Sequence, residues 1–305
     1  MVKPRPGQGA SSGPAPNPPA AANPPDGGLT GGFQLTEAQF AKLASLVYSL
    51  CGIHLGEGKR ELLRARLAKR LRATGCRDVK DYIEVMEGDR SGQELVCFLD
   101  VITTNKTDFF REPKHFEFLV DEVLPKLDKL CAGGEALRIW SAACSTGEEP
   151  YTLAMVLMES RALWERRGAG ILASDLSTKV LEQAQNGVYA QDRATDIPRP
   201  LLTKYFQRGT NRWAGYVRVR PELRKMVQFR RINLMDPFDF DKPFHVIFCR
   251  NVMIYFDKPT QERLVDKFRN CLVQGGYLMV GHSESLTGIH HRLAFARPAV
   301  YRRQD

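Results

Sequence analysis

The sequence predicts a doubly wound α/β fold, a mostly parallel sheet with helices on both faces, behind a small all-α domain. From residue 137 onward, short apolar runs alternate with helical segments, which is the pattern of β-α-β units. Residues 33–110 show helical periodicity instead. The first apolar run of the alternating part breaks into a small-residue loop, Ala143–Glu149, which leads directly into a helix. With 305 residues, the chain is long enough for two domains with separate cores.

Residues 1–32 contain eight prolines and seven glycines and almost no large apolar side chains. Such a segment buries too little surface to offset its ordering entropy, so we expect a disordered tail. It lacks the apolar core of a signal peptide, and no apolar run approaches the ~18 residues that span a bilayer. Seven scattered cysteines without a C-x-x-C pair favour reduced thiols and give no zinc-ligand spacing. We therefore expect a cytoplasmic protein without a metal site or membrane insertion.

The all-α domain is predicted over 33–110. Its first helix follows Thr36 and ends at Gly52, and its second places three leucines on one stripe before ending near Gly75. Two more amphipathic segments follow. The predicted helices are 40–50, 59–73, 78–87 and 94–103.

The α/β domain is predicted over 111–305. Strands are expected at 137–142, 170–174, 227–232, 245–249, 277–281 and 299–302, and helices at 152–166, 178–186 and 258–273. Gly275 and Gly276 are predicted to form a turn. Residues 196–226 break the β-α alternation, and the polar–apolar alternation at 216–220 between glycine turns predicts a small antiparallel β-subdomain inserted there.

The loop after the first strand indicates what kind of ligand the α/β domain binds. Helix N-termini attract anions, and dinucleotide sites hold a pyrophosphate there over a G-x-G-x-x-G turn. This loop has one glycine, Gly147, and its helix begins with Glu148 and Glu149. Two carboxylates repel a pyrophosphate but accommodate a positively charged ligand with hydroxyl groups. S-adenosylmethionine, with its sulfonium, ammonium and ribose, fits that description, so the loop favours a methyltransferase.

Two further strand ends carry candidate site residues, because ligands of open α/β sheets bind over the carboxyl ends of the strands. Asp175 follows the second strand, where a carboxylate can accept hydrogen bonds from ribose hydroxyls, as it does in NAD sites too. Arg250 and Asn251 follow the fourth strand and precede an aromatic turn. The three strand ends are predicted to converge on one site.

These residues resemble the chemotaxis-receptor protein-glutamate O-methyltransferases of the CheR type. The resemblance covers nearly all of 33–305 and rests on the motifs Thr104–Glu112, Trp140–Tyr151, Ala173–Asp175, Asn233-Leu234, Phe248–Phe256 and Gly281–Ser285. It implies a Rossmann-like S-adenosylmethionine-dependent methyltransferase domain with a small β-subdomain insert, preceded by a small all-α domain. It implies Arg111 and Tyr255 as catalytic residues nearest the transferred methyl group. It also implies that the cofactor, whose product is S-adenosylhomocysteine, contacts Asn105, Thr107, Arg111, Glu149, Asp175, Asn233, Leu234, Arg250 and Asn251.

The resemblance implies methyl transfer to glutamate side chains in chemoreceptor cytoplasmic helices, giving glutamyl methyl esters for sensory adaptation. A glutamate with pKa ~4.3 is already ionised at neutral pH and needs no general base. The net charge of +9 favours an acidic partner. Lys59, Arg66 and Arg70 fall on one flank of the second helix and are predicted to dock the acidic receptor helices. The β insert resembles the subdomain with which some family members hold the receptor's C-terminal peptide.

Other interpretations stay open. An RNA or small-molecule methyltransferase on the same fold would suit the charge, but the site lacks the Asn-Pro-Pro-aromatic element common in amino-group methylation, and Asn23-Pro24-Pro25 lies in the tail; no nucleic-acid partner is expected. A non-catalytic adaptor is the third alternative, disfavoured because Arg111, Asp175, Asn251 and Tyr255 are all intact. Arg111 could instead form a surface salt bridge, and Tyr255 could be only a packed aromatic. Glu148 is interpreted as a first-turn residue that complements the helix dipole, outside the site.

Overall fold

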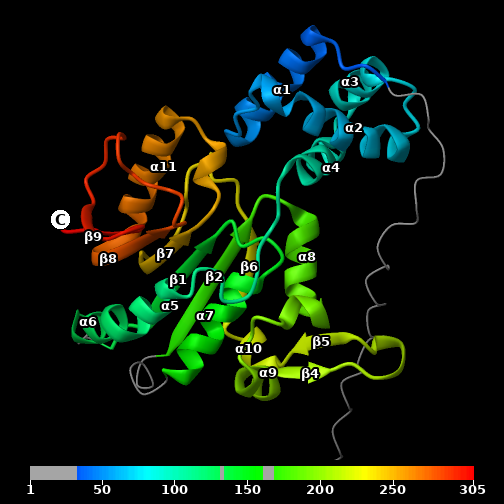
Figure 1. Ribbon diagram of the computed structural model, residues 1–305. Coiled ribbons are helices and arrows are strands. Elements are labelled where there is room, and N and C mark those ends of the chain that lie inside the picture. Colours follow the sequence, from blue (N-terminus) through cyan, green and yellow to red (C-terminus); the bar gives the residue numbers. More distant parts are fainter. Residues whose placement is uncertain (1–32, 131–133, 161–167) are drawn as a thin grey trace, which may run out of the picture.

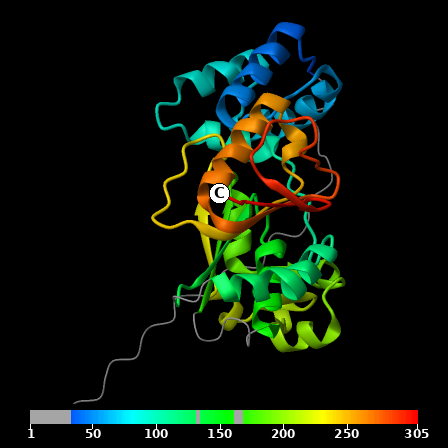
Figure 2. The ribbon, with the colours of Figure 1, turned by 90° about the vertical axis from the view of Figure 1, so that its left-hand side faces the viewer.

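The computed structural model describes residues 33–130, 134–160 and 168–305, arranged as an all-α domain above one end of an α/β domain (Figures 1 and 2). The predicted tail 1–32 and the end of the helix predicted over 152–166 lie outside the described residues. Within the described part of the chain, no helix combines the length and the apolar character needed to cross a bilayer.

The all-α domain contains the helices that the periodicity predicts, within one to three residues at each end. They are α1 (Glu37–Cys51), α2 (Arg60–Thr74), α3 (Val79–Gly88) and α4 (Gln93–Ile102), with a short 3-10 helix η1 (Glu57–Lys59) before α2. Thr36 begins α1 with a capping box, in which the Thr36 and Gln39 side chains each accept a hydrogen bond from the other's backbone N–H. The leucine stripe of α2 is buried in this domain's core.

The α/β domain is built on a sheet with strand order β6-β2-β1-β7-β8-β10-β9. The strands from β6 to β8 are parallel, whereas β10 and β9 run antiparallel. Strand order reverses between β1 and β7, which is where open α/β sheets bind ligands. The strands are β1 (Leu137–Ala142), β2 (Ala169–Asp175), β6 (Val227–Arg231), β7 (Phe244–Cys249), β8 (Leu272–Val280), β9 (Ala294–Arg297) and β10 (Val300–Arg302).

Helices cover both faces of this sheet. Neighbouring residues of a strand point to opposite sides, and in β1 the side chains on both sides are apolar and need cover. Ile139 of β1 packs into the core formed with α5 (Lys114–Phe118), α6 (Leu124–Leu130) and α7 (Glu148–Glu159). Trp140 points to the other face, where its ring meets Phe268 of α11 (Lys258–Cys271) edge-on at 5.3 Å. Helix α8 (Thr178–Asn186) packs along β2 and β6.

The predicted turn at Gly275 and Gly276 is wrong, because both residues lie inside β8. The pairing of β8 with β7 jumps from Phe244↔Leu272 to Val246↔Tyr277, so extra residues of β8 bulge out of the ladder. Gly275 adopts φ +79°, and a Cβ on Gly276 would lie 2.9 Å from a backbone carbonyl. The glycines therefore permit a bulge rather than a chain reversal.

The antiparallel subdomain is a sheet in the order β3-β5-β4, from β3 (Val188–Ala190), β4 (Phe206–Arg208) and β5 (Tyr216–Val219). Strand β3 precedes the predicted insert 196–226, because a three-residue strand directly after α8 has too little alternation to detect. Helices α9 (Arg199–Tyr205) and α10 (Pro221–Arg224) flank the hairpin. The β4–β5 hairpin lies toward the end of the molecule opposite the all-α domain (Figure 1).

Candidate active site

A cleft lies between the all-α domain and the carboxyl ends of the parallel strands. The fold brings all the predicted site residues except Arg70 to this cleft. Its strand-end wall consists of Ala143, Ser145 and Glu149 after β1, Asp175 and Leu176 after β2, Ile232–Leu234 after β6, and Arg250–Val252, Tyr255 and Phe256 after β7. Its other wall consists of Cys51, Ile53, Leu55, Lys59, Leu62, Arg66, Ile102–Asp108 and Arg111.

Hydrogen bonds between the two domains fix the width of the cleft. Asn233 Nδ2 donates to the Leu50 carbonyl at 2.6 Å, and the His54 N–H donates to the Tyr255 carbonyl at 2.8 Å. The Asn233 side chain is thus engaged with the all-α domain, and the end of the cleft near Tyr255 is tied to it as well. Because Nδ2 already has this partner, the predicted contact of Asn233 with the cofactor falls to the other atoms of the residue.

The loop after β1 contains three residues in the left-handed region of the backbone. Ala143 and Ser145 adopt φ +65° and +50°, and Gly147 adopts φ +96°. A Cβ on Gly147 would lie 2.8 Å from Ala184, so the close approach of α8 also requires glycine. Asp175 accepts hydrogen bonds from the Ser145 N–H at 2.8 Å and from the Ser177 N–H at 3.0 Å, and burial raises the pKa of this carboxyl. Asp175 therefore shapes the loop and also borders the cleft.

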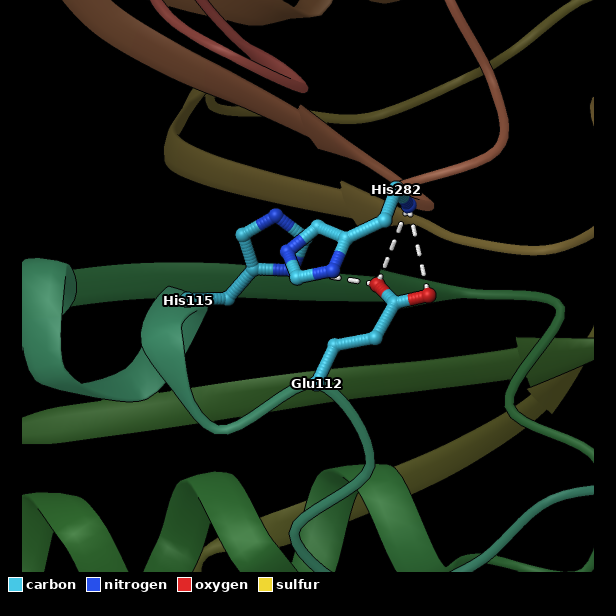
Figure 3. A group of neighbouring side chains, drawn as sticks. All are labelled: Glu112, His115 and His282. Carbon is cyan, nitrogen blue, oxygen red and sulfur yellow. Dashed lines mark hydrogen bonds and ion pairs between the residues drawn. The ribbon is translucent and has the colours of Figure 1, made fainter.

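Glu112, the last residue of the motif Thr104–Glu112, was not among the predicted site residues but lies directly behind Arg250 and Asn251 of the cleft wall. Its carboxylate accepts the His282 N–H at 3.2 Å, and the rings of His115 and His282 lie beside it (Figure 3). Burial acts to raise the pKa of Glu112, but the charge of Arg250 and its hydrogen bonds outweigh it and lower the pKa. Glu112 is therefore an anion at neutral pH.

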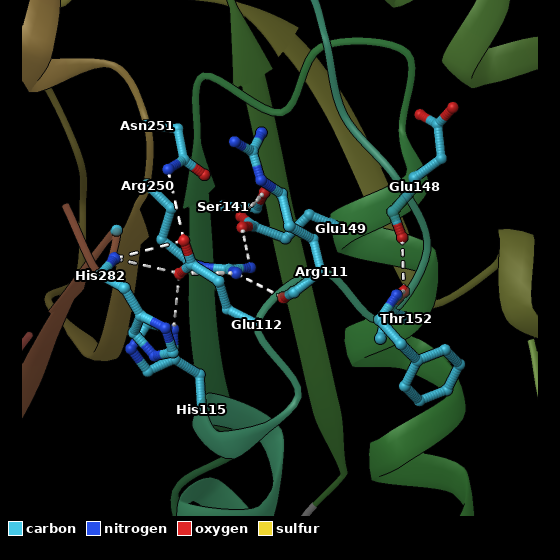
Figure 4. A network of polar contacts seen from close by, with 12 residues as sticks. Arg111, Glu112, His115, Ser141, Glu148, Glu149, Thr152, Arg250, Asn251 and His282 are labelled. Carbon is cyan, nitrogen blue, oxygen red and sulfur yellow. Dashed lines mark hydrogen bonds and ion pairs between the residues drawn. The ribbon is translucent and has the colours of Figure 1, made fainter. Parts of the chain in front are cut away.

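A buried polar chain runs from Glu112 to the start of α7 (Figure 4). Arg250 donates from Nη2 to Glu112 at 3.0 Å and from Nη1 to Glu149 at 2.9 Å, and it also donates to the Arg111 carbonyl. Ser141 Oγ donates to the other oxygen of Glu149 at 2.7 Å. One guanidinium is thus shared between the two carboxylates Glu112 and Glu149, so the group keeps a net negative charge at the wall of the cleft.

The segment carrying Thr107 and Arg111 is anchored through a buried ion pair. Arg193 Nη2 donates at 2.6 Å both to the Thr107 carbonyl and to Glu148, whose side chain has no exposed surface. Glu148 lies in the first turn of α7, as predicted, and its buried carboxylate also holds the segment that carries Thr107 in place through Arg193. The Arg111 side chain donates to the Lys106 carbonyl at 3.0 Å and lines the cleft.

Two of the three predicted docking cations lie at the cleft instead of along an outer flank. Lys59 Nζ is 5.5 Å from the centroid of the Tyr255 ring, and Arg66 donates to the carbonyl of the last residue of α4. Arg70 does not reach the cleft, because it forms a two-point ion pair with Glu94, at 2.9 and 2.6 Å. This ion pair lies within the all-α domain, and the role of Arg70 in docking stays a prediction.

Comparison with known proteins assigns both domains. Residues 38–103 match the model of the CheR methyltransferase all-alpha domain, and residues 105–301 match the model of the CheR methyltransferase SAM binding domain. The chain belongs to the CheR methyltransferase family. Its α/β domain is accordingly an S-adenosylmethionine-binding domain, which fits a cleft with carboxylates at the start of α7 and after β2.

Relatives that match this chain over nearly their whole length support the assignment to the family. The chemotaxis protein methyltransferase of Borreliella burgdorferi is 41% identical over 278 residues, covering 89% of this chain and 96% of the relative. The chemotaxis protein methyltransferases of Salmonella typhimurium and Escherichia coli are each 38% identical over 274 residues, covering 90% of this chain and 92% and 93% of theirs. The chain thus carries S-adenosylmethionine-dependent methyltransferase domains of the chemotaxis type over nearly its whole described length.

In this CheR chain, Glu284 organises the loop after β7. It is buried, and its carboxylate accepts the backbone N–H groups of Asn251 at 2.6 Å, Gly281 at 2.7 Å and Ile254 at 3.2 Å. Asn251 adopts φ +57°, a conformation that this anchoring maintains. The sequence alone assigns no role to the motif Gly281–Ser285, because two of the three N–H groups that Glu284 accepts lie about thirty residues earlier.

Proposed function

We propose that this protein transfers the methyl group of S-adenosylmethionine to glutamate side chains of chemoreceptor cytoplasmic helices, forming glutamyl methyl esters. The observation that carries the proposal is that three cations line the cleft together with Tyr255: Lys59, Arg66 and Arg111 border the same cleft as the loops after the parallel strands. An anionic acceptor is attracted to such a place. The described residues lining the cleft include no histidine, which suits an acceptor that is already ionised.

The chemistry requires positioning more than proton transfer. When bound, S-adenosylmethionine supplies a methyl group on a sulfonium. An anion and a cation become two neutral products, so charge disperses in the transition state, and alignment with exclusion of water supplies most of the acceleration. In this proposal Arg111 holds a carboxylate with its planar guanidinium, and Tyr255 forms a wall beside the methyl group. The cofactor contacts are proposed from Asn105, Thr107, Arg111, Glu149, Asp175, Asn233, Leu234, Arg250 and Asn251.

The deciding experiment is transfer of labelled methyl from S-adenosylmethionine to a receptor cytoplasmic fragment, followed by mild alkali. Label on the protein that is released as methanol supports glutamyl ester formation. Alkali-stable label would contradict it, because methylated amines survive this treatment. Binding of the cofactor without any receptor labelling would direct attention to RNA or small-molecule acceptors.

Tyr255→Phe is expected to lower kcat about tenfold or more while changing the Kd of S-adenosylmethionine less than twofold. The variant retains the ring that lies near Lys59 and removes only the hydroxyl group. A group that acts in the transition state affects kcat, whereas a group that only packs does not. Steady-state kinetics and calorimetric titration measure the two quantities. Equal losses in kcat and cofactor affinity would contradict a role of Tyr255 at the methyl group.

The receptor is proposed to dock at the cleft mouth formed by Lys59 and Arg66, near the apolar Leu62 and Ile254. These two apolar side chains are 41% and 51% exposed, so they are free to contact a bound helix. In the methyl-transfer assay, KM for the receptor fragment should rise with salt, since exposed charge pairs are screened. A salt-independent KM would place docking elsewhere.

The subdomain β3–β4–β5 is proposed to hold the receptor's C-terminal peptide. A pocket beside its hairpin is lined by Val188, Gln207–Thr210, Trp213 and Tyr216–Arg218. Tethering raises the local concentration of substrate without touching the chemistry. A receptor fragment lacking its C-terminal residues should therefore show a higher KM and an unchanged kcat in the same assay.

A further inference from the structure

Glu112, His115 and His282 form a cluster next to the cleft that methyl transfer does not use. One potential ligand atom from each residue lies within 4.8 Å of the other two (Figure 3). Glu112 precedes α5, His115 lies in the first turn of α5, and His282 lies in the loop after β8. Local spacing gave no reason to expect a metal site, because the third residue comes from a distant part of the chain.

The environment of His115 points to a missing partner. The residue is 2% exposed, and neither ring nitrogen has a hydrogen-bond partner among the described residues. Burying an imidazole without any partner is unfavourable. Its Nδ1 is 3.5 Å from Glu112 Oε2, a contact too long for a good hydrogen bond. Two ligands that share a tetrahedral zinc ion are separated by about the same distance, roughly 3.3 Å.

We propose that Glu112, His115 and His282 bind Zn²⁺, with a fourth position open to water beside the exposed His282. Two imidazoles and one carboxylate form a donor set that suits zinc and disfavours Mg²⁺. The Glu112 carboxylate is also oriented by Arg250 and Asn251, which donate to it at 3.0 and 3.4 Å. Ligating carboxylates commonly have such outer hydrogen bonds. The positive charge of Arg250 opposes a cation, so we expect micromolar rather than nanomolar affinity.

The zinc site is coupled to the cofactor cleft through one side chain. Arg250 donates to Glu112 on one side and to Glu149 on the other. A cation bound to Glu112 compensates the negative charge that Glu112 otherwise offers to Arg250. Arg250 then pairs more strongly with Glu149, so the carboxylate that borders the cleft attracts a cationic ligand less. Zinc occupancy is therefore expected to weaken S-adenosylmethionine binding, and the cofactor must weaken zinc binding by the same factor.

Calorimetric titration of the full chain with Zn²⁺ tests the site, and Mg²⁺ serves as the negative ion. His282→Ala should weaken zinc binding about tenfold or more, whereas His290→Ala should bind zinc as the wild type does. His290 is a suitable control because it is another exposed histidine, in the same loop. If both variants bind zinc as tightly as the wild type, the cluster is not a zinc site.

The coupling has its own readout. The Kd of S-adenosylmethionine should rise about threefold or more when Zn²⁺ is saturating, and this rise should disappear in His282→Ala. An unchanged cofactor Kd at saturating zinc would overturn the coupling while the zinc titration still reports on the site. Neither measurement depends on which acceptor is methylated, so failure here is distinguishable from failure of the proposed function.

Discussion

Glu284→Ala is expected to lower kcat/KM for methyl transfer about 100-fold. The substitution leaves the backbone N–H groups of Asn251, Gly281 and Ile254 without their acceptor. The loop that carries Asn251 and Tyr255 then loses the anchor that fixes its conformation. A displacement of about 1 Å in a positioned group can cost ~10²-fold in rate. Steady-state kinetics on the folded variant measure the loss.

Two further variants separate positioning from general damage. Glu284→Gln retains an acceptor for part of the N–H set, so its activity should lie between those of the wild type and Glu284→Ala. Ser283→Ala, at the neighbouring exposed position, should leave kcat/KM within twofold of wild type. Denaturant unfolding gives the stability change separately, expected at about 1–3 kcal/mol for buried groups left unpaired. Full activity of the remaining folded Glu284→Ala protein would show that Glu284 only stabilises the fold.

Glu148→Ala is expected to lower the free energy of unfolding by about 3 kcal/mol. Glu148 has no exposed surface, and it accepts hydrogen bonds from Arg193 at 2.6 Å and from Thr146 at 2.6 Å. Removing one partner of a buried ion pair leaves the other charge poorly compensated, at a typical cost of ~3–5 kcal/mol. We place the effect at the low end because the Arg193 side chain is 41% exposed and can turn toward water. Urea unfolding followed by circular dichroism measures it.

The same change should weaken S-adenosylmethionine binding, because Arg193 also holds the Thr107 carbonyl. Glu182→Ala is the matched control: this glutamate lies on the exposed side of α8, and its removal should change stability by less than about 0.5 kcal/mol. A Glu148→Ala protein as stable as the Glu182→Ala protein would show that the ion pair contributes nothing net.

Much of the fold followed from local patterns. The leucine spacing of α2 and the cap at Thr36 predicted the all-α domain, because each is a short-range property of a helix. The parallel strands were predicted for a similar reason: apolar runs buried on both faces stand out between helices. Short elements escaped prediction. Strand β3, helix α5 and the bulge at Gly275 depend on partners elsewhere in the chain, and three to five residues carry little periodicity of their own.

The sequence also determined which side chains could meet at a site, since Asp175, Glu149 and Arg250 follow strands whose carboxyl ends must share one edge of a sheet. The tertiary structure decided what those side chains do there. It paired Glu149 with Arg250, withdrew Arg70 into a bond with Glu94, and buried Glu148 against Arg193. Charge on a side chain is visible in a sequence, but its partner is set by packing between segments far apart in the chain. The cluster of Glu112, His115 and His282 has the same origin, because only the folded chain brings its members together.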